Sequence, residues 1–392
     1  MFDIKQEVKK IESEIIEWRR ALHQIPELHD ELPQTTSFIR AQLDEMGIKY
    51  KIYSNMGISA VIEGNESGPV IGFRADMDAL PIEEETDLPF ASSNGNMHAC
   101  GHDAHVAMLL GAAKVLSEHR AQFNGKVVLI FQPAEETSGG AKQMIEEGCL
   151  AEPKVDRFIS FHTGNLFADV KSGCFGIKKG PMFASVSTFY VKIEGIGGHG
   201  ARPHECIDPV LISCEIIQAL QKLVSRETSP THSAVITVGT FHAGTVANAI
   251  PKEAKFGGTV RTHSQEDADR LEQRIKETVM LTAQASRASA EVEYIRYYPP
   301  TVNNGEVTDF LAECAGKILG KENVIEVEPT TGTEDVAYYI NEVPGSYGVL
   351  GSQKSHDDGK LYPHHNSKFH LDESVFWIGS AIFVQCALDF CK

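Results

Sequence analysis

The stretch Met97-His-Ala-Cys-Gly-His-Asp-Ala-His105 is followed directly by the apolar run Val106–Leu116. The run predicts a buried helix, and the stretch before it predicts a loop at the helix N-terminus. Because helix positions two apart point to different sides, Cys100 and His102 could not bind one ion from a helix interior. A tight loop at Gly101 would bring them together. A helix N-terminus lowers the pKa of a Cys, which makes Cys100 a candidate metal ligand or nucleophile.

The other residues of this loop favour a metal site over a chance cluster of polar residues. A Cys-x-His pair alone would fit chance. Here Asp103 and His105 lie in the same turn, and each is a strong ligand or an orienting group for one. Thiolate, imidazole and carboxylate ligands together suit Zn, Mn, Co or Ni, and availability often decides between these metals.

Three apolar runs elsewhere in the chain end in further ligand-type residues. The runs at 70–73, 127–131 and 158–161 predict buried strands of a largely parallel sheet. Open α/β sheets bind their ligands at the carboxyl ends of the strands. The residues at those ends are Asp76 and Asp78, then Glu135 and Glu136, and finally His162. A shared site at one edge of the sheet is therefore predicted.

Two of these residues also have a structural interpretation. Asp78 fits a loop-capping carboxylate as well as a group that orients a His ligand, and His162 alone would fit a core histidine. The adjacent carboxylates Glu135 and Glu136 favour hydrolysis. If one binds a metal, the other is free to take a proton from a metal-bound water.

Size and charge limit the class of the protein. At about 150 residues per domain, a chain of 392 residues predicts two or three domains. A net charge of -18 argues against nucleic acid and anionic membranes as partners. The N-terminus lacks an apolar signal core, and the longest apolar run, Trp377–Leu388, is too short to span a membrane. The eight Cys are scattered, which is typical of reduced thiols in a cytoplasmic protein.

The middle of the chain has a different pattern. Residues 185–194 alternate between apolar and polar, as in an antiparallel strand. The sequence then predicts a helix at 208–226, strands at 234–241 and 254–263, a helix at 265–287 and a strand at 290–297. Two repeats of strand, helix and strand predict an α+β, ferredoxin-like domain with a four-stranded antiparallel sheet and two helices on one face.

The predicted fold class is therefore α/β with one domain inserted into another. Residues 1–183 and 298–392 would form a catalytic metal-binding domain with a mixed, largely parallel sheet flanked by helices. Residues 184–297 would form the inserted satellite domain. Periodic apolar residues predict helices of the first domain at 3–23, 35–47 and 372–390.

Two common catalytic motifs are missing from the sequence. The Gly-rich segment Gly195–Gly198 lacks the Gly-Lys-Ser/Thr of a phosphate loop. The chain has no Gly-x-Ser-x-Gly elbow, so Ser/His/Asp catalysis has no support.

Over essentially its whole length the chain resembles the M20 metallopeptidase family. It is most similar to the amidohydrolase branch, subfamily D, which includes N-acyl-amino-acid aminoacylases, auxin-conjugate hydrolases, hippurate hydrolases and related carboxypeptidases. The segments that carry the resemblance are Phe73-Arg-Ala-Asp-Met-Asp-Ala-Leu-Pro, Met97-His-Ala-Cys-Gly-His-Asp-Ala-His, Gln132-Pro-Ala-Glu-Glu, Gly197-Gly-His-Gly-Ala-Arg-Pro-His, Gly258-Thr-Val-Arg and Gly332-Thr-Glu-Asp.

The resemblance implies two divalent metal ions per chain, with Cys100 as the bridging ligand. In other branches of the family a carboxylate has this role. The resemblance also implies that Glu135 is the general base, which takes a proton from the attacking water and later gives one to the leaving amine. The remaining metal ligands would be His102, Glu136, His162 and His365.

In the inserted domain the resemblance implies residues that contact the substrate. His199 would contact the substrate or its oxyanion, and Asn248 and Arg261 would hold the substrate carboxylate. An Arg fork suits a carboxylate better than a Lys does. The domain would close over the substrate. It would also pair with a second subunit, so a homodimer is expected.

The sequence departs from the family pattern at the last ligand. The family motif reads His-Asn-Pro or His-Ser-Pro, whereas this chain has His365-Asn-Ser with His364 just before it. The spacing to Phe369 favours His365 as the ligand over His364. The Thr163-Gly-Asn segment after His162 is also a less common variant.

The expected function is metal-dependent hydrolysis of the amide bond of N-acyl amino acids. A metal-dependent dipeptidase or carboxypeptidase on the same scaffold is the alternative, because these enzymes share the metals and differ only in the pocket. A metal or peptide binder without catalysis is a further class. The presence of Glu135 argues against it, since a binder needs the ligands but not the base.

Overall fold

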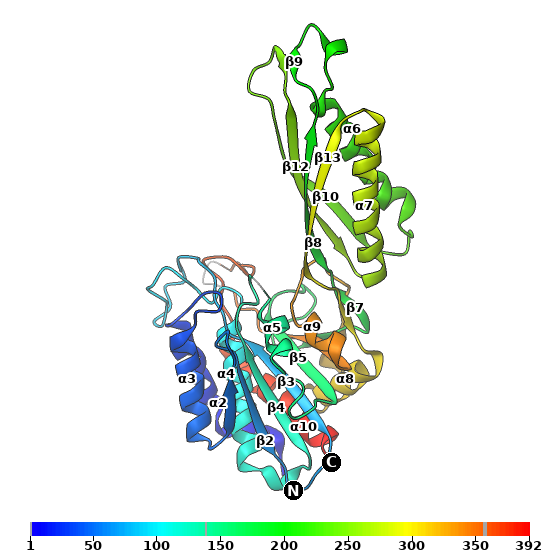
Figure 1. The fold of residues 1–392 in the computed structure, drawn as a ribbon. Helices are drawn as coiled ribbons and strands as arrows, with labels where there is room; N and C mark the ends of the chain where they lie inside the picture. Colours follow the sequence, from blue (N-terminus) through cyan, green and yellow to red (C-terminus); the bar gives the residue numbers. More distant parts are fainter. Residues whose placement is uncertain (1, 138, 356–358) are drawn as a thin grey trace. The chain divides into compact units, whose positions relative to one another are not determined.

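The computed structural model describes residues 2–137, 139–355 and 359–392, and it divides into two compact units (Figure 1). Unit 1 contains Met1–Gly180, Asn303–Glu328 and Asp335–Lys392. Unit 2 contains Pro181–Val302 and Pro329–Glu334. Unit 1 is therefore assembled from three separate stretches of the chain.

An eight-stranded mixed sheet forms the centre of unit 1, in the order β1-β2-β4-β3-β5-β16-β6-β15. The neighbours β4, β3, β5 and β16 run parallel, whereas β1, β2 and β6 each pair antiparallel with a neighbour. The strands are β1 Lys49–Ile52, β2 Ile58–Glu63, β3 Val70–Asp76, β4 Lys126–Gln132, β5 Arg157–Gly164, β6 Phe175–Ile177, β15 Val324–Glu326 and β16 Gly345–Gly351. The predicted α/β class with a mixed, largely parallel sheet is confirmed.

Helices flank this sheet, and two of them pack tightly together. Helices α4 and α10 contact each other and both contact β3. Gly111 allows this close approach, because a Cβ atom there would lie 2.5 Å from Oγ of Ser380 on α10. The helices are α1 Ile4–Lys10, α2 Glu12–His23, α3 Pro33–Glu45, α4 His102–Glu118, α5 Gly140–Glu146, α8 Gly305–Leu319, α9 Ala337–Glu342 and α10 Phe376–Phe390.

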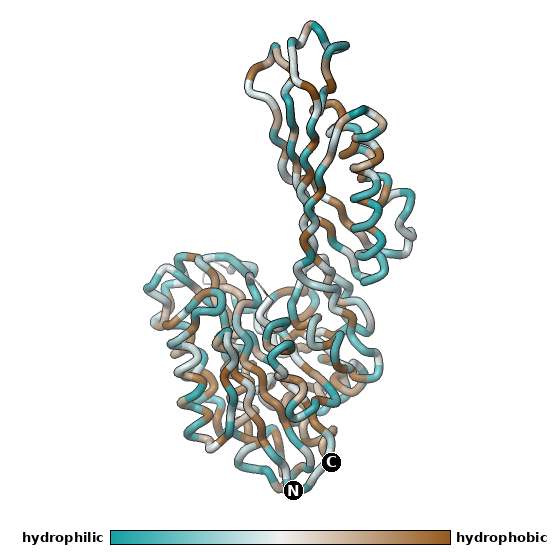
Figure 2. Tube along the Cα trace, in the orientation of Figure 1, coloured by the Kyte–Doolittle hydropathy of each residue, from teal (hydrophilic) through white to brown (hydrophobic). Residues whose placement is uncertain are grey.

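The core of unit 1 follows the apolar runs of the sequence. All seven residues of β3 are buried, as expected for a strand covered on both faces. Figure 2 shows apolar segments concentrated along the strands inside unit 1. Phe383 of α10 packs against Phe73 of β3 and Phe161 of β5, with ring centroids 4.9 and 4.2 Å apart respectively. These contacts hold together β3 and β5, the strands whose carboxyl ends carry ligand-type residues.

Two helices of unit 1 begin or break differently from the prediction. Helix α4 begins at His102 rather than Val106, because Gly101 just before it adopts a left-handed conformation (φ 88°) that glycine tolerates. The predicted single helix at 3–23 is two helices, which are separated at Ile11.

Unit 2 contains an antiparallel four-stranded sheet in the order β10-β12-β8-β13. Alternate residues of β8 are buried in one core with residues of α6 and α7, so both helices cover the same face. The elements are β8 Val186–Glu194, α6 Pro209–Lys222, β10 Ala234–Ala243, β12 Glu253–Thr262, α7 Gln265–Ala285 and β13 Ser289–Tyr298. Shorter strands form two separate pairs, β9 Gly198–His199 with β11 Ala249–Ile250 and β7 Gly180–Phe183 with β14 Thr301–Asn303.

One segment of the described chain, Glu373–Phe390, is long and apolar enough to cross a membrane by length and composition alone. It is longer than the predicted run Trp377–Leu388, because it includes a short 3-10 turn, Glu373–Val375, and the whole of α10. In this segment 61% of the residues are buried inside the protein. Helix α10 packs on α4 and α8, which is the environment of a core helix.

Candidate metal centre

The carboxyl ends of three parallel strands meet at one edge of the unit 1 sheet. Strand β3 lies between β4 and β5, and all three run in the same direction. Asp76 ends β3, Glu135 and Glu136 follow β4, and His162 lies near the end of β5. This is the edge at which open α/β sheets bind ligands.

The residues predicted as metal ligands lie close together at this edge. The Sγ atom of Cys100 lies 3.3 Å from Nε2 of His162. Ligand atoms of Cys100, His102 and His162 all lie within 4.8 Å of one another, and those of Cys100, Glu136 and His365 form a second such group. Cys100 therefore belongs to both groups, as a ligand shared by two ions would.

The predicted base lies beside these groups. Ligand atoms of Glu135 and Glu136 form a third group with His102, again within 4.8 Å of one another. The carboxylate of Asp78 accepts hydrogen bonds from the backbone N–H groups of Glu135 and Glu136, both at 3.1 Å. Asp78 therefore fixes the turn that presents the two adjacent carboxylates.

Backbone carbonyl groups orient the two buried imidazoles. Nδ1 of His102 lies 2.9 Å from the carbonyl oxygen of Asp78, and Nδ1 of His162 lies 2.7 Å from that of Thr163. A carbonyl oxygen can only accept a hydrogen bond, so Nδ1 carries the proton in both rings. The lone pair of Nε2 then faces the cluster, which is the orientation that a metal-binding His needs.

Two buried polar atoms of the cluster form no hydrogen bond. They are Nε2 of His102 and Oε1 of Glu136, the second of which lies 3.2 Å from Nε2 of His365 as an ion pair. Buried polar groups in proteins almost always have a partner, so such atoms indicate an additional group that they bind. A metal ion fits both atoms, because neutral imidazole nitrogens and carboxylate oxygens are good ligands for Zn and Mn.

The electrostatics of the cluster also suit a cation. The expectation that the helix N-terminus lowers the pKa of Cys100 is wrong for this site, because burial raises the pKa of the thiol well above its usual value and the charges of Glu136 and Glu135 raise it further. Burial acts to lower the pKa of His102, but the charge of Asp76 and the hydrogen bond to Asp78 raise it to about 10. Without a cation, the negative site therefore retains protons on a thiol and an imidazole. A divalent ion would supply the positive charge and displace these protons.

The two candidates for the last ligand lie in different surroundings. Nε2 of His365 lies 3.2 Å from Oε1 of Glu136, inside the cluster. The backbone N–H of His365 donates to the carbonyl of Ala99 at 2.9 Å, next to Cys100. Nε2 of His364 instead accepts a hydrogen bond from the backbone N–H of Asn165 at 3.1 Å. Only the side chain of His365 points its Nε2 toward the other ligand-type residues.

A buried charged network supports the N-terminus of α4. Asp103, next to His102, lies 2.9 Å from Nε of Arg19 and 2.7 Å from Nδ1 of His23. His23 also contacts Glu84, with Nε2 and Oε1 3.1 Å apart. Arg19, His23 and Glu84 were not predicted from the sequence. Arg19 and His23 could have been noticed as two basic residues at positions i and i+4 on an otherwise apolar helix face.

Two of the residues predicted to contact substrate lie together in unit 2. His199 is exposed and pairs with Ala249 in the two-stranded sheet of β9 and β11. The carbonyl oxygen of Asn248 accepts a hydrogen bond from the backbone N–H of Gly200 at 2.9 Å. His199 and Asn248 are thus neighbours beyond the N-terminal end of β12.

Arg261 lies at the opposite end of the same strand. Its Nη1 donates to the carbonyl oxygen of Thr331 at 2.9 Å, and burial lowers its pKa from the usual value. At about 3.3 Å per residue, the distance along β12 from Glu253 to Arg261 is about 26 Å. Within unit 2, therefore, Arg261 is not brought together with His199 and Asn248.

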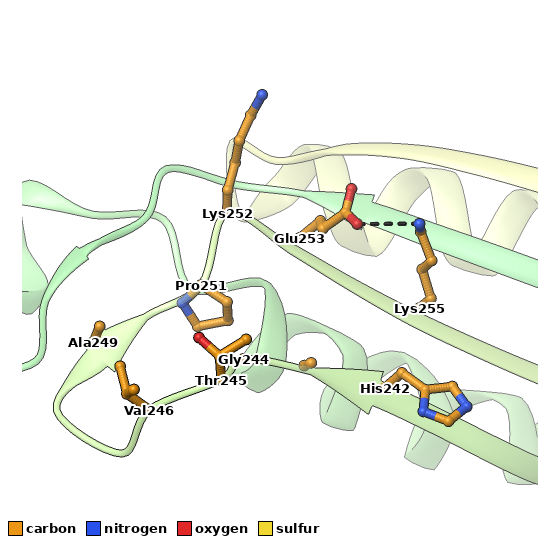
Figure 3. Close-up of a pocket in the computed structure, with 10 residues that line it drawn as sticks. His242, Gly244, Thr245, Val246, Ala249, Pro251, Lys252, Glu253 and Lys255 are labelled. Carbon is orange, nitrogen blue, oxygen red and sulfur yellow. Dashed lines mark ion pairs between the residues drawn. The ribbon is translucent and has the colours of Figure 1, made fainter.

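Unit 2 also has a surface pocket near the end of β10 (Figure 3). Lys252, Glu253 and Lys255 line it, and the last two form an ion pair at 3.1 Å. None of the described residues predicted to contact substrate is part of its lining.

The fold and the cluster in unit 1 together define a metal-dependent hydrolase. A cysteine, imidazoles and carboxylates of the kinds that bind transition metals lie together there, and a further carboxylate lies beside them. A family model described as Peptidase family M20/M25/M40 matches residues 72–389. The chain belongs to this family.

Characterised relatives place the chain in the amidohydrolase branch of the family. It is 41% identical to N-acetyl-L-cysteine deacetylase from Bacillus subtilis, over 96% of this chain and 88% of that protein. It is 38% identical to thermostable carboxypeptidase 1 from Saccharolobus solfataricus, over 99% of this chain and 98% of that protein. It is also 38% identical to IAA-amino acid hydrolase ILR1-like 4 from Arabidopsis thaliana, over 94% of this chain and 84% of that protein.

A solved structure of similar sequence has the same fold. It is a Bacillus subtilis protein described as a dinuclear metal binding peptidase from the M20 family. The TM-score is 0.84 at 35% identity, and the match covers 98% of this chain and 99% of that one.

Proposed function

We propose that this protein hydrolyses the amide bond of N-acyl amino acids, releasing the acyl acid and the free amino acid. The observation that carries the proposal is the position of Glu135, whose carboxylate lies in one group with the ligand-type residues His102 and Glu136. A protein that only binds metal would have no need for this additional carboxylate. The similarity to N-acetyl-L-cysteine deacetylase and to IAA-amino acid hydrolase supports an acyl group on the substrate nitrogen.

Two divalent ions, Mn, Zn, Co or Ni, are proposed for the cluster. One group of donors is Cys100, His102 and His162, and the other is Cys100, Glu136 and His365. The ions would supply Lewis acidity that polarises the scissile carbonyl and acidifies the attacking water. The structural relative described as dinuclear supports the number of ions.

The chain itself would move the proton. In the proposed mechanism the carboxylate of Glu135 takes a proton from the attacking water. The same carboxyl group later gives a proton to the leaving nitrogen, so that the amino acid departs as a neutral amine. Asp78 aligns this carboxylate by binding the backbone N–H of Glu135 at 3.1 Å.

Three residues of unit 2 are proposed to bind the substrate, and unit 2 to close over it. Arg261 would pair with the substrate carboxylate, because a guanidinium forms two parallel hydrogen bonds with a carboxylate. Asn248 would donate its amide to the same carboxylate. His199 would stabilise the negative charge that develops on the carbonyl oxygen.

The separation of Arg261 from His199 along β12 leads us to propose a homodimer with shared sites. A distance of about 26 Å is much longer than an N-acyl amino acid, so both residues cannot contact one substrate molecule from the same unit 2. In a two-fold dimer formed through unit 2, the second chain would supply the His199 that the first chain cannot bring to its own Arg261. Each site would then combine Arg261 of one chain with His199 of the partner subunit.

Mixing two inactive variants tests the shared site. Random dimers of Glu135→Gln and His199→Ala are expected to regain about a quarter of wild-type turnover, because half of the dimers are mixed and each has one intact site. The control mixes Glu135→Gln with His102→Ala. Both of these substitutions lie in unit 1, so each chain has a defective metal centre and every site of a mixed dimer remains inactive. No recovery in the first mixture, with mixed dimers verified by two affinity tags, would mean that His199 does not act across the dimer.

A carboxypeptidase or dipeptidase is the second candidate, favoured by the similarity to thermostable carboxypeptidase 1. The two candidates are separated by stripping the metal, adding back Mn, Zn, Co or Ni, and following amino-acid release from a substrate panel. The panel contains N-acetyl, N-benzoyl and N-indoleacetyl amino acids and dipeptides. Metal-restored turnover of the acyl conjugates is the expected result. Preference for dipeptides would establish the peptidase, and two bound metals without turnover of any substrate would favour a binder.

A further inference from the structure

Strand β3 carries a fully buried cation. Arg74 is 2% exposed, and its guanidinium donates hydrogen bonds to the side chains of Asp76, Asp335 and Gln132. Nη1 donates to Oδ2 of Asp76 at 2.7 Å, Nη2 to Oδ1 of Asp335 at 2.7 Å, and Nε to Oε1 of Gln132 at 2.9 Å. A buried ion pair is costly to form, so it is weak evidence for a role in stability alone.

Asp76 lies where a further metal ligand could be. Its Oδ2 atom is 3.6 Å from Nε2 of His102, one of the two cluster atoms that form no hydrogen bond. Two ligands of one tetrahedral ion, each bonded at about 2.0–2.1 Å, lie about 3.3 Å apart. Asp76, His102 and His105 also form a group whose ligand atoms lie within 4.8 Å of one another.

Both oxygens of Asp76 are already engaged by protein groups. Oδ1 is hydrogen-bonded to Nδ1 of His105, and Nε2 of His105 accepts from the backbone N–H of Thr163 at 2.8 Å. His105 must therefore carry its proton on Nδ1 and donate to Asp76. Oδ2 is held by Arg74. The sequence left open whether His105 is a ligand or an orienting group, and these contacts favour an orienting group.

The guanidinium of Arg74 cannot easily turn away from Asp76. On its other side Asp335 accepts from Nη2, and Oδ2 of Asp335 accepts from Nε2 of Gln132 at 2.7 Å and from the backbone N–H of Ala141 at 3.1 Å. Asp335, Gln132 and Asp76 are each 0% exposed. The contacts on three sides thus fix the direction in which Arg74 presents its N–H groups.

We propose that Arg74 is a positioning residue that keeps Asp76 out of the ligand set of the metal centre. The inference rests on the proposed function, since it requires a metal ion at the Cys100 cluster. Arg74 competes with the ion for Oδ2 of Asp76. A catalytic metal site keeps a coordination position open for water or substrate, whereas a structural site is closed by protein ligands. By occupying Asp76, Arg74 preserves that open position.

The test uses cobalt as a spectroscopic probe in the full-length protein. Wild-type protein loaded with two equivalents of Co(II) is expected to show thiolate charge-transfer absorption and visible ligand-field bands. In Arg74→Met, Oδ2 of Asp76 becomes free to bind cobalt. We expect the visible bands to lose intensity and shift, because ligand-field absorption weakens as the coordination number rises. In the double variant Arg74→Met/Asp76→Asn, the wild-type bands should return, since the amide of Asn is a poor ligand.

Asp335→Asn is the matched control, because it perturbs the other ion pair of Arg74 and leaves the pair with Asp76. It should lower thermal stability and change the cobalt spectrum less than Arg74→Met does, because the guanidinium that binds Asp76 is still present. An equal spectral change in Asp335→Asn, or a double variant that keeps the altered spectrum, would overturn the proposal. If Arg74→Met does not fold, Arg74→Lys replaces it. A Lys ammonium cannot make all three contacts of the guanidinium, so a smaller change in the same direction is expected, and an unchanged spectrum would again overturn the proposal.

The wild-type spectrum separates this inference from the proposed function. Absence of thiolate charge-transfer absorption in cobalt-loaded wild-type protein would mean that the metal centre itself is wrong. Normal wild-type bands that are unchanged in folded Arg74→Met would refute only the role of Arg74.

Discussion

Glu135→Gln is expected to lower turnover about 100- to 10,000-fold, which is the usual contribution of a general acid–base residue. Gln has almost the same shape as Glu but cannot take a proton. The backbone N–H of Glu135, bound by Asp78 at 3.1 Å, is unaffected by the change, so the turn should persist. We therefore expect both metal ions to remain bound. Turnover and metal content, measured on the same sample, check the prediction.

Glu136→Gln is the matched control, because it makes the same chemical change at the next residue. Oε1 of Glu136 lies 3.2 Å from Nε2 of His365 and belongs to a predicted ligand group. This variant should lose bound metal as well as turnover. If Glu135→Gln kept its turnover, Glu135 would not be the base. If the two variants lost the same amount of metal, the division of roles between the adjacent carboxylates would be wrong.

The central fold of unit 1 was predictable because its strands are continuous apolar runs. The run at 127–131 became most of β4, and the run at 158–161 became the first half of β5. Such runs are typical of parallel strands covered on both faces, and their length excludes a long helix. The carboxyl ends of these strands then place Glu135, Glu136 and His162 at one edge.

Strand β16 was missed because its sequence, Gly345-Ser-Tyr-Gly-Val-Leu-Gly351, is rich in a residue that is depleted in strands. The structure shows why glycine is there. A Cβ atom at Gly348 would lie 2.5 Å from the ring of Phe175 on the neighbouring β6, and one at Gly351 would lie 2.1 Å from the carbonyl oxygen of Lys171. The glycines allow close packing between segments distant in sequence, which no local pattern reveals.

Which site residues could be predicted from the sequence depended on how distinctive their side chains are. Cys100 and His102 are unusual as neighbours in a loop, so residue type and spacing alone indicated a metal centre. Arg74 gave no such signal, because its significance depends on Asp335, which is 261 positions away in the chain. The predicted strand at 254–263 already placed Arg261 near one strand end, but no sequence pattern showed that His199 pairs with Ala249 beyond the other end.

Cys100→Ser is expected to remove most of the bound metal and to lower turnover at least as much as Glu135→Gln. A Ser hydroxyl remains neutral near pH 7 and cannot replace a thiolate that belongs to both ligand groups. Loss of a residue that merely orients a ligand costs about 10- to 100-fold in metal affinity, so loss of a shared ligand should cost more. Metal content after gel filtration, together with turnover, measures the effect.

Cys100→Asp provides the informative comparison, because it restores an anionic ligand at the same position. The negative charge favours a divalent ion, so we expect Cys100→Asp to bind more metal than Cys100→Ser and to recover part of the turnover. Cobalt-loaded Cys100→Asp should lack thiolate charge-transfer absorption. If Cys100→Ser and Cys100→Asp bound as much metal as the wild type, Cys100 would not be a ligand. If Cys100→Ser lost turnover but kept both ions, Cys100 would act as a nucleophile, the other role that its position before α4 allows.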